Sequence, residues 1–138
     1  MTNDIGHTRT RTARRTSRAI TVAAGVAGSL LLWVIEVPWL GLDLAVRQGD
    51  TVQRVGAAAV TAAALIAGLA AWALLAVLER TVRRPVLTYR IIASVVLILS
   101  LAGPLGSGVD TGSRLALAGM HLTVGIAAIV GLPSRRDC

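Results

Sequence analysis

Four long apolar segments separated by short polar gaps dominate this sequence, and arginine crowds every second gap. The segments cover residues 19–40, 55–78, 86–105 and 113–132. A helix of about 20 apolar residues is long enough to cross the hydrocarbon layer of a bilayer. No run of alternating ten-residue strands, as a membrane β-barrel would need, competes with this pattern. The sequence therefore predicts an all-α membrane protein, a bundle of four transmembrane helices.

The composition leaves few residues for a soluble domain beside the four apolar segments. Hydrophobic residues make up 54% of the 138 positions, which is high for a soluble domain. We expect a four-helix transmembrane domain over residues 19–133, and a short cytoplasmic C-terminus over 134–138. Residues 1–18 are polar and show no apolar periodicity, so we expect them to form a disordered basic cytoplasmic tail.

The distribution of arginine predicts the orientation, because cytoplasmic loops carry an excess of basic residues. One side of the predicted bundle has only Arg47, Arg54 and Arg114. The other side has the remaining eleven: Arg9, Arg11, Arg14, Arg15, Arg18, Arg80, Arg83, Arg84, Arg90, Arg135 and Arg136. We therefore expect both termini in the cytoplasm and the protein in the plasma membrane. The formal charge of +7 does not indicate nucleic-acid binding, because the arginines gather at segment ends and form no continuous basic face.

Small residues predict where the helices touch, because helices in lipid associate through close approach of their backbones. The second segment carries such residues at alternating steps of four and three: Ala57, Thr61, Ala64, Gly68 and Ala71. This spacing fits a left-handed helix pair, so we interpret it as a helix-packing face. The third segment is bulkier, and we expect it to face lipid.

Two ionisable residues fall at membrane depth, where such groups are costly and mark candidate functional sites. Glu36 lies near the outer end of the first segment, and His121 lies in the outer half of the fourth. Together they could relay protons, or bind a cation or a basic ligand. Alternatively, Glu36 lies close enough to the membrane surface to be solvated, and His121 only donates a hydrogen bond to a neighbouring carbonyl or threonine. The sequence leaves both interpretations open.

The first gap contains the candidate outer-loop residues Asp43, Arg47 and Asp50. Charges spaced in this way form either a solvated, mutually compensated surface or a small recognition loop. Gly49 and Asp50 are typical of a turn. Tyr89 and Trp39 would lie in the aromatic belts at the two membrane surfaces.

Motifs for cofactor chemistry are absent from the sequence. The single cysteine, Cys138, cannot form an internal disulfide, and no group of residues has the spacing of a zinc site. No phosphate-binding or dinucleotide-binding glycine motif appears. We therefore expect no metal, no cofactor and no enzymatic activity.

Several short motifs occur in a fixed order from the first segment to the last. They include Pro38-Trp39-Leu40-Gly41-Leu42-Asp43-Leu44, Ala71-Trp72-Ala73-Leu74-Leu75, Leu99-Ser100-Leu101-Ala102-Gly103-Pro104 and His121-Leu122. In this the chain resembles an uncharacterised family of four-span actinobacterial membrane proteins. The resemblance implies a four-helix membrane unit but brings no activity or site residues.

Three functions follow as hypotheses. The first is a non-enzymatic membrane subunit that lies in the lipid bilayer and packs with itself, as a homo-oligomer, or with a larger membrane-protein partner. The alternative is a small transporter or proton-coupled channel module that uses Glu36 and His121. A membrane enzyme acting on lipid has the least support, because it needs a polar cluster that the sequence does not display.

Overall fold

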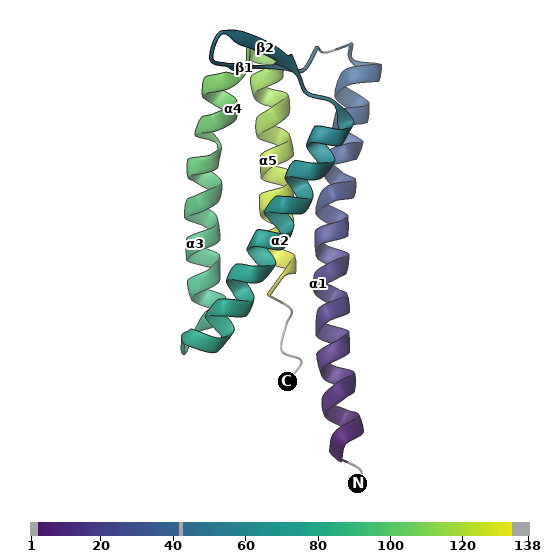
Figure 1. The fold of residues 1–138 in the computed structure, drawn as a ribbon, viewed down its shortest axis with the longest axis vertical. Coiled ribbons are helices and arrows are strands. Elements are labelled where there is room, and N and C mark those ends of the chain that lie inside the picture. The colour runs from purple at the N-terminus through teal and green to yellow at the C-terminus, as the bar shows by residue number, and fades with distance from the viewer. Residues whose placement is uncertain (1–2, 42, 134–138) are drawn as a thin grey trace.

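The computed structural model describes residues 3–41 and 43–133. Its elements are α1 (Asn3–Val34), the π-helix η1 (Ile35–Trp39), β1 (Ala45–Gln48), β2 (Thr51–Arg54), α2 (Ala57–Thr81), α3 (Pro85–Ser100), α4 (Ala102–Ser107) and α5 (Thr111–Gly131). The helices run side by side along the long axis, while the two strands lie across one end, the hairpin end (Figure 1). Helix α2 is the exception, because it crosses the bundle diagonally (Figure 1).

Four helices are long and apolar enough to cross a membrane, by length and composition. They cover Thr12–Trp39, Ala57–Thr81, Pro85–Ser107 and Thr111–Gly131, and each overlaps one predicted segment. The third consists of α3 and α4, which are separated at Leu101. Pro104 accounts for this break, since it has no N–H to donate to the carbonyl of Ser100 four residues earlier.

The N-terminal segment differs from the prediction of a disordered tail over residues 1–18. Helix α1 begins at Asn3 and continues without interruption into the first apolar segment. Extending an existing helix is far easier than starting one, and arginine is a good helix former. Periodicity alone therefore misses such an extension. Residues 1–2 and 134–138 of the predicted termini lie outside the described residues.

The first gap is a β-hairpin, so the prediction of an all-α chain is wrong in this segment. β1 and β2 pair antiparallel, with Ala45 opposite Arg54 and Gln48 opposite Thr51. The two-residue turn predicted at Gly49 and Asp50 is confirmed, and the φ of Gly49 is 59°, which glycine adopts without strain.

The end of α1 widens into the π-helix around Pro38. The N–H of Leu40 donates to the carbonyl of Ile35, five residues back, at 3.1 Å. A π turn accommodates the proline, which cannot donate a helical hydrogen bond. Gly41 then ends the helix with a φ of 65°, in the conformation that favours glycine after a helix C-terminus.

Close backbone approaches hold α1, α2 and α5 together. A Cβ atom built on Gly68 of α2 would lie 2.8 Å from Val22 Cγ1 of α1. A Cβ atom on Gly131 of α5 would lie 2.5 Å from Thr21 Cγ2 of α1. Helix α1 therefore packs against both neighbours at positions where only glycine fits.

Two clusters of buried side chains form the core. One, near the hairpin, contains Leu44, Val60, Ala116 and Met120. The other, near the opposite end, contains Leu75, Leu78, Tyr89 and Leu132. The prediction that Tyr89 lies in a membrane-surface aromatic belt is wrong. Its side chain is 0% exposed, and its hydroxyl donates to the carbonyl of Ala128 on α5 at 3.1 Å.

Candidate binding groove

An apolar groove with a volume of about 550 Å³ lies between α2 and α3. It exists because α2 approaches α3 at one end of the bundle and diverges toward α1 at the hairpin end (Figure 1). Helix α5 lies behind the gap and forms the floor. We call it the lateral groove. Its walls include Ala59, Ala63, Ala67 and Ala70 of α2 with Ala93, Val96 and Leu97 of α3, and its floor includes Leu117, His121, Val124 and Gly125.

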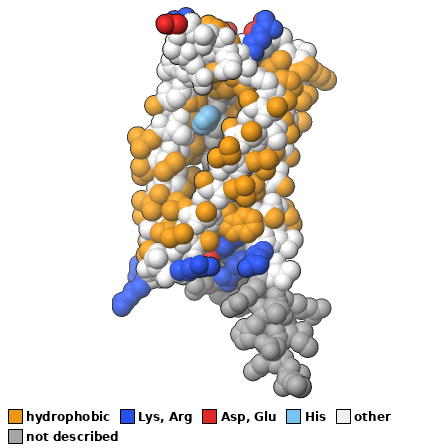
Figure 2. Space-filling model, in the orientation of Figure 1, with side chains coloured by type: hydrophobic (Ala, Val, Ile, Leu, Met, Phe, Trp, Pro, Cys, Tyr) orange, Lys and Arg blue, Asp and Glu red, His pale blue; other side chains and the backbone are white. Residues whose placement is uncertain are grey.

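The groove opens on the side of the bundle, where Figure 2 shows it as a hollow with a histidine side chain near its hairpin end. Leucine and valine side chains surround this opening on α3, where Val96 is 56% exposed. Helix α3 also exposes Val95, Ile98 and Leu99 elsewhere on its surface, as expected for a helix that faces lipid. An occupant of the lateral groove must therefore be apolar.

The hydroxyl groups that line the groove already have partners. Ser29 donates to the carbonyl of Gly25 at 3.0 Å, and Ser100 donates to that of Leu97 at 2.8 Å. Tyr89 is bonded to Ala128 as described above. These bonds leave no free hydroxyl donor among the three residues, so the lining is almost wholly apolar in character.

Two residues in the lining of the groove are ionisable, Tyr89 and His121, and His121 is the one that titrates near neutral pH as a residue type. Its Nδ1 atom lies 3.0 Å from the carbonyl oxygen of Leu117, one turn earlier on α5. A carbonyl only accepts, so Nδ1 carries the proton, and a neutral imidazole then has Nε2 as an acceptor. The contact to Leu117 corresponds to the local hydrogen bonding considered for this residue in the sequence.

Glu36 and His121, the two ionisable residues predicted at membrane depth, differ in their surroundings. Glu36 lies in the π-helix and does not line the lateral groove. Its side chain is partly buried, and its Oε2 atom is buried with no hydrogen-bond partner. Within residues 3–41 and 43–133, no hydrogen bond or ion pair joins it to His121. The described contacts therefore do not join the two candidate residues, and only His121 lines the lateral groove.

The candidate outer-loop residues lie apart on the hairpin and on the chain that enters it. Asp43 approaches Arg54 at 3.9 Å, but both side chains are at least 80% exposed. Arg47 lies in β1 opposite Val52, and Asp50 lies in the turn. This arrangement corresponds to the solvated surface more closely than to a recognition pocket.

A polar contact that sequence reasoning missed attaches the hairpin to the bundle. The Ser113 hydroxyl donates to the carbonyl of Asp43 at 3.2 Å, and the Ala45 N–H donates to the Ser113 hydroxyl at 3.4 Å. Asp110 caps α5, since its carboxylate accepts from the Ser113 N–H at 2.8 Å. Ser113, through its hydroxyl and then its N–H, lowers the pKa of the Asp110 carboxyl. Asp at this position is a recognisable helix-start signal.

An ion pair at the opposite end was also missed. Arg18 on α1 donates to the carboxylate of Glu79 on α2, and only 7% of the Arg18 side chain is exposed. The two residues are 61 positions apart. The sequence pattern assigns Arg18 to the tail. The signal that could have found the pair is Glu79, a single acidic residue at the end of an apolar segment, which suggests a basic partner.

These features define a mostly helical protein with four helices suited to cross a membrane and a hollow on the side of the bundle. The chain belongs to DUF6069, a family of unknown function whose model matches residues 9–137. No curated protein and no solved structure matches the chain.

Proposed function

We propose that this protein is a non-enzymatic, multi-pass membrane subunit that binds a transmembrane helix at the lateral groove, and that this helix is α2 of a second copy. The alanine wall of the groove carries the proposal. Ala59, Ala63 and Ala67 follow one another at steps of four, and Ala70 comes three residues later. All four are exposed.

A helix is the occupant that this wall suits best. Small residues at such spacing let two helix backbones approach closely, which is a main source of helix association in lipid. The neighbouring face of α2, which shares Ala64 and Ala71 with the lining of the groove, also brings small residues against another helix within the chain. There Ala64 and Gly68 of the predicted packing face are buried, and Gly68 lies against Val22 of α1. The alanine wall is a second small-residue face with no helix against it in the described chain.

The volume of the groove limits the size of the group that can enter it. A whole helix has a diameter of about 10 Å including side chains, which is too large for this space. The side chains from one helix face fit a volume of about 550 Å³. The occupant therefore lies across the mouth of the groove and inserts bulky side chains.

Helix α2 itself carries suitable side chains. Ile66 is 69% exposed and Leu69 is 54% exposed, and both neighbour Ala67 and Ala70 in sequence on the same helix. A two-fold symmetric interface requires one surface to carry both the inserted group and its receiving site. Ile66 beside the alanine wall meets that requirement, and this favours a second copy over an unrelated helix.

The proposed membrane placement is compatible with such a pair. The arginines of α1 and of the α2–α3 connection lie at the end away from the hairpin, which supports cytoplasmic termini in a plasma membrane. Two copies inserted in the same direction have parallel α2 helices, so a two-fold axis along the membrane normal relates them.

The alternative of a small transporter or proton-coupled module has less support. It rests on Glu36 and His121 acting together, and only His121 lines the groove. The other ionisable side chain in the groove lining, that of Tyr89, already donates its hydroxyl proton to the carbonyl of Ala128.

Cysteine crosslinking in native membranes tests the proposal. In a Cys138→Ser background, Ala67→Cys should give a disulfide-linked band of twice the monomer mass after mild oxidation. Ile98→Cys is the matched control, because Ile98 is 68% exposed on α3 and lies outside the lining of the groove. This control should remain monomeric.

Two results would contradict the proposal. One is a dimer band of equal strength from Ala67→Cys and Ile98→Cys, which indicates random collision. The other is no dimer from Ala67→Cys under conditions in which a membrane-permeant maleimide labels the thiol. A crosslink from Ala67→Cys to a different protein alone would overturn the second copy as occupant.

A further inference from the structure

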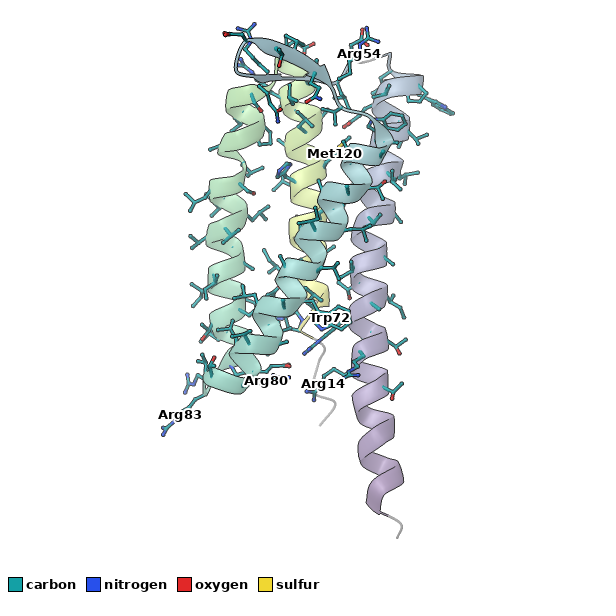
Figure 3. The ribbon with its side chains drawn as sticks, in the orientation of Figure 1. Arg14, Arg54, Trp72, Arg80, Arg83 and Met120 are labelled. Atoms are coloured by element: carbon teal, nitrogen blue, oxygen red, sulfur yellow. The ribbon has the colours of Figure 1, made fainter. Side chains whose placement is uncertain are left out.

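A corner lined with arginine lies at the end of the bundle away from the hairpin. Helix α1 projects past the ends of α2 and α3 there (Figure 1). Arg14 and Arg15 lie on the projecting part of α1, while Arg80, Arg83 and Arg84 lie at the end of α2 and in the connection to α3. Figure 3 shows Arg14, Arg80 and Arg83 at this same end. We call these five residues the arginine corner.

The Arg18–Glu79 ion pair holds α1 against the end of α2 at this corner. Glu79 is the residue directly before Arg80. Arg14 lies four residues before Arg18 and hence on the same face of α1, about 6 Å further along the axis at 1.5 Å per residue. Arg14 therefore lies at the level of the α2 end, near Arg80, whereas Arg83 projects from the α2–α3 connection on the side away from α1 (Figure 3).

Positive charge in this corner exceeds the negative charge on α2 and the α2–α3 connection. Glu79 is the only acidic residue of α2 or the α2–α3 connection, and Arg18 already pairs with it. Among the described residues, the five members of the arginine corner make no ion pair, and all five are exposed. Figure 2 shows the resulting band of basic side chains along this edge.

Apolar surface begins directly beside the arginines. Ile20 of α1, two residues after Arg18, is 62% exposed, and Leu87 of α3, three residues after Arg84, is 53% exposed. A ligand that covers both surfaces must combine an anionic group with a hydrocarbon chain. Guanidinium groups bind phosphate oxygens in a two-pronged geometry, so phosphate is the anion that best suits this site.

We infer that the arginine corner binds the phosphate headgroup of an anionic phospholipid, with the acyl chains lying against α1 and α3. The binding is independent of the proposed pairing through the lateral groove, because the two surfaces share no residue. A basic site between helices at the membrane surface is a known type of headgroup site.

Lipid binding to the full chain, measured by native mass spectrometry, tests the inference. Phosphatidylglycerol is the anionic probe and phosphatidylcholine the zwitterionic one. The wild-type protein should retain phosphatidylglycerol in preference to phosphatidylcholine. Replacing Arg80, Arg83 and Arg84 with Gln should weaken phosphatidylglycerol binding by about 10- to 100-fold, since each basic residue near an anionic surface contributes about a fivefold factor in affinity.

The matched control replaces Arg47, Arg54 and Arg114 with Gln, which removes the same charge at the hairpin end. It should change phosphatidylglycerol binding less than about twofold, because surface charges more than ~10 Å away are screened at ordinary salt. Thermal unfolding followed by circular dichroism identifies any variant that is misfolded. If the variant at Arg80, Arg83 and Arg84 is misfolded, the double variant Arg14→Gln with Arg15→Gln on α1 is tested in its place.

Three results would overturn the inference. The first is equal retention of the two lipids by the wild-type protein. The second is an equal loss of binding in the control variant, which indicates a general effect of net charge. The third is displacement of the lipid by millimolar inorganic phosphate, which indicates a site for a free anion and no contribution from the acyl chains.

Discussion

Arg18 on α1 forms an ion pair with Glu79 on α2, and the Arg18 side chain is almost fully buried. The Nε atom of Arg18 is also buried and has no hydrogen-bond partner. The carboxylate of Glu79 is therefore the group that balances a buried cation. Removal of one partner from a buried pair costs more than removal of both, because an uncompensated charge remains.

Glu79→Gln should lower the free energy of unfolding in detergent by about 1–3 kcal/mol, a value below that of a fully buried pair because 30% of the Glu79 side chain is exposed. The double change Arg18→Met with Glu79→Gln should recover part of this loss. Arg80→Gln, an exposed neighbour, is the control and should have little effect. The idea of a buried cation held by Glu79 would be wrong if the double variant were less stable than Glu79→Gln alone.

The close contact between Gly68 and Val22 makes a second prediction. Gly68→Ala places a methyl group 2.8 Å from Val22 Cγ1, so either the Val22 side chain or helix α1 must shift. Overpacking of this kind costs about 1–3 kcal/mol. Thermal unfolding in detergent measures the change.

Gly119→Ala is the matched control, because a Cβ atom at Gly119 of α5 would have nothing within 4 Å. That variant should be as stable as the wild type or more stable by up to about 1 kcal/mol, since alanine favours a helix over glycine. Equal losses from the two substitutions would mean that helix flexibility, and not the contact with Val22, determines the result.

The capping residue Asp110 predicts a pH dependence. Because its pKa is lowered in the folded state, its contribution to stability is present above the ordinary pKa of Asp, near ~3.9, and is lost as the pH falls through the lowered value. Asp110→Asn retains a capping side chain but cannot titrate.

Thermal midpoints of the wild type and Asp110→Asn, measured in detergent from neutral pH down to acid, give the comparison. The wild type should lose stability relative to Asp110→Asn only below the ordinary pKa of Asp. A constant difference between the two proteins across this range would rule out the capping carboxylate as a titrating group.

Much of the helical part of the fold follows from local information. The four apolar segments predict their helices because length and apolarity are properties of consecutive residues. The packing of Gly68 against Val22 agrees with a small-residue spacing that is visible in the sequence. The hairpin was missed because its strands have only four residues each, and β2 is exposed throughout, so no alternation marks it.

The groove could not be predicted, because it depends on how helices are placed in space. It comes from the diagonal course of α2, which no spacing of residues records (Figure 1). Arg18 and Glu79 are likewise 61 positions apart. Glu36 and His121 looked like a pair because both occur at similar membrane depth, yet depth does not fix the direction in which a side chain points.

The central claim is that α2 helices pair through the alanine wall, and energy transfer between labelled copies in lipid vesicles tests it most directly. Ala67→Phe fills the site that receives Ile66, so it should raise the dimer dissociation constant by about 5- to 150-fold and lower the dimer fraction at a fixed protein-to-lipid ratio, given losses of ~1–3 kcal/mol for overpacking. Ile98→Phe, on the exposed face of α3, should leave the dimer fraction unchanged. Undiminished energy transfer in Ala67→Phe, or monomeric wild-type protein at every ratio, would contradict the claim.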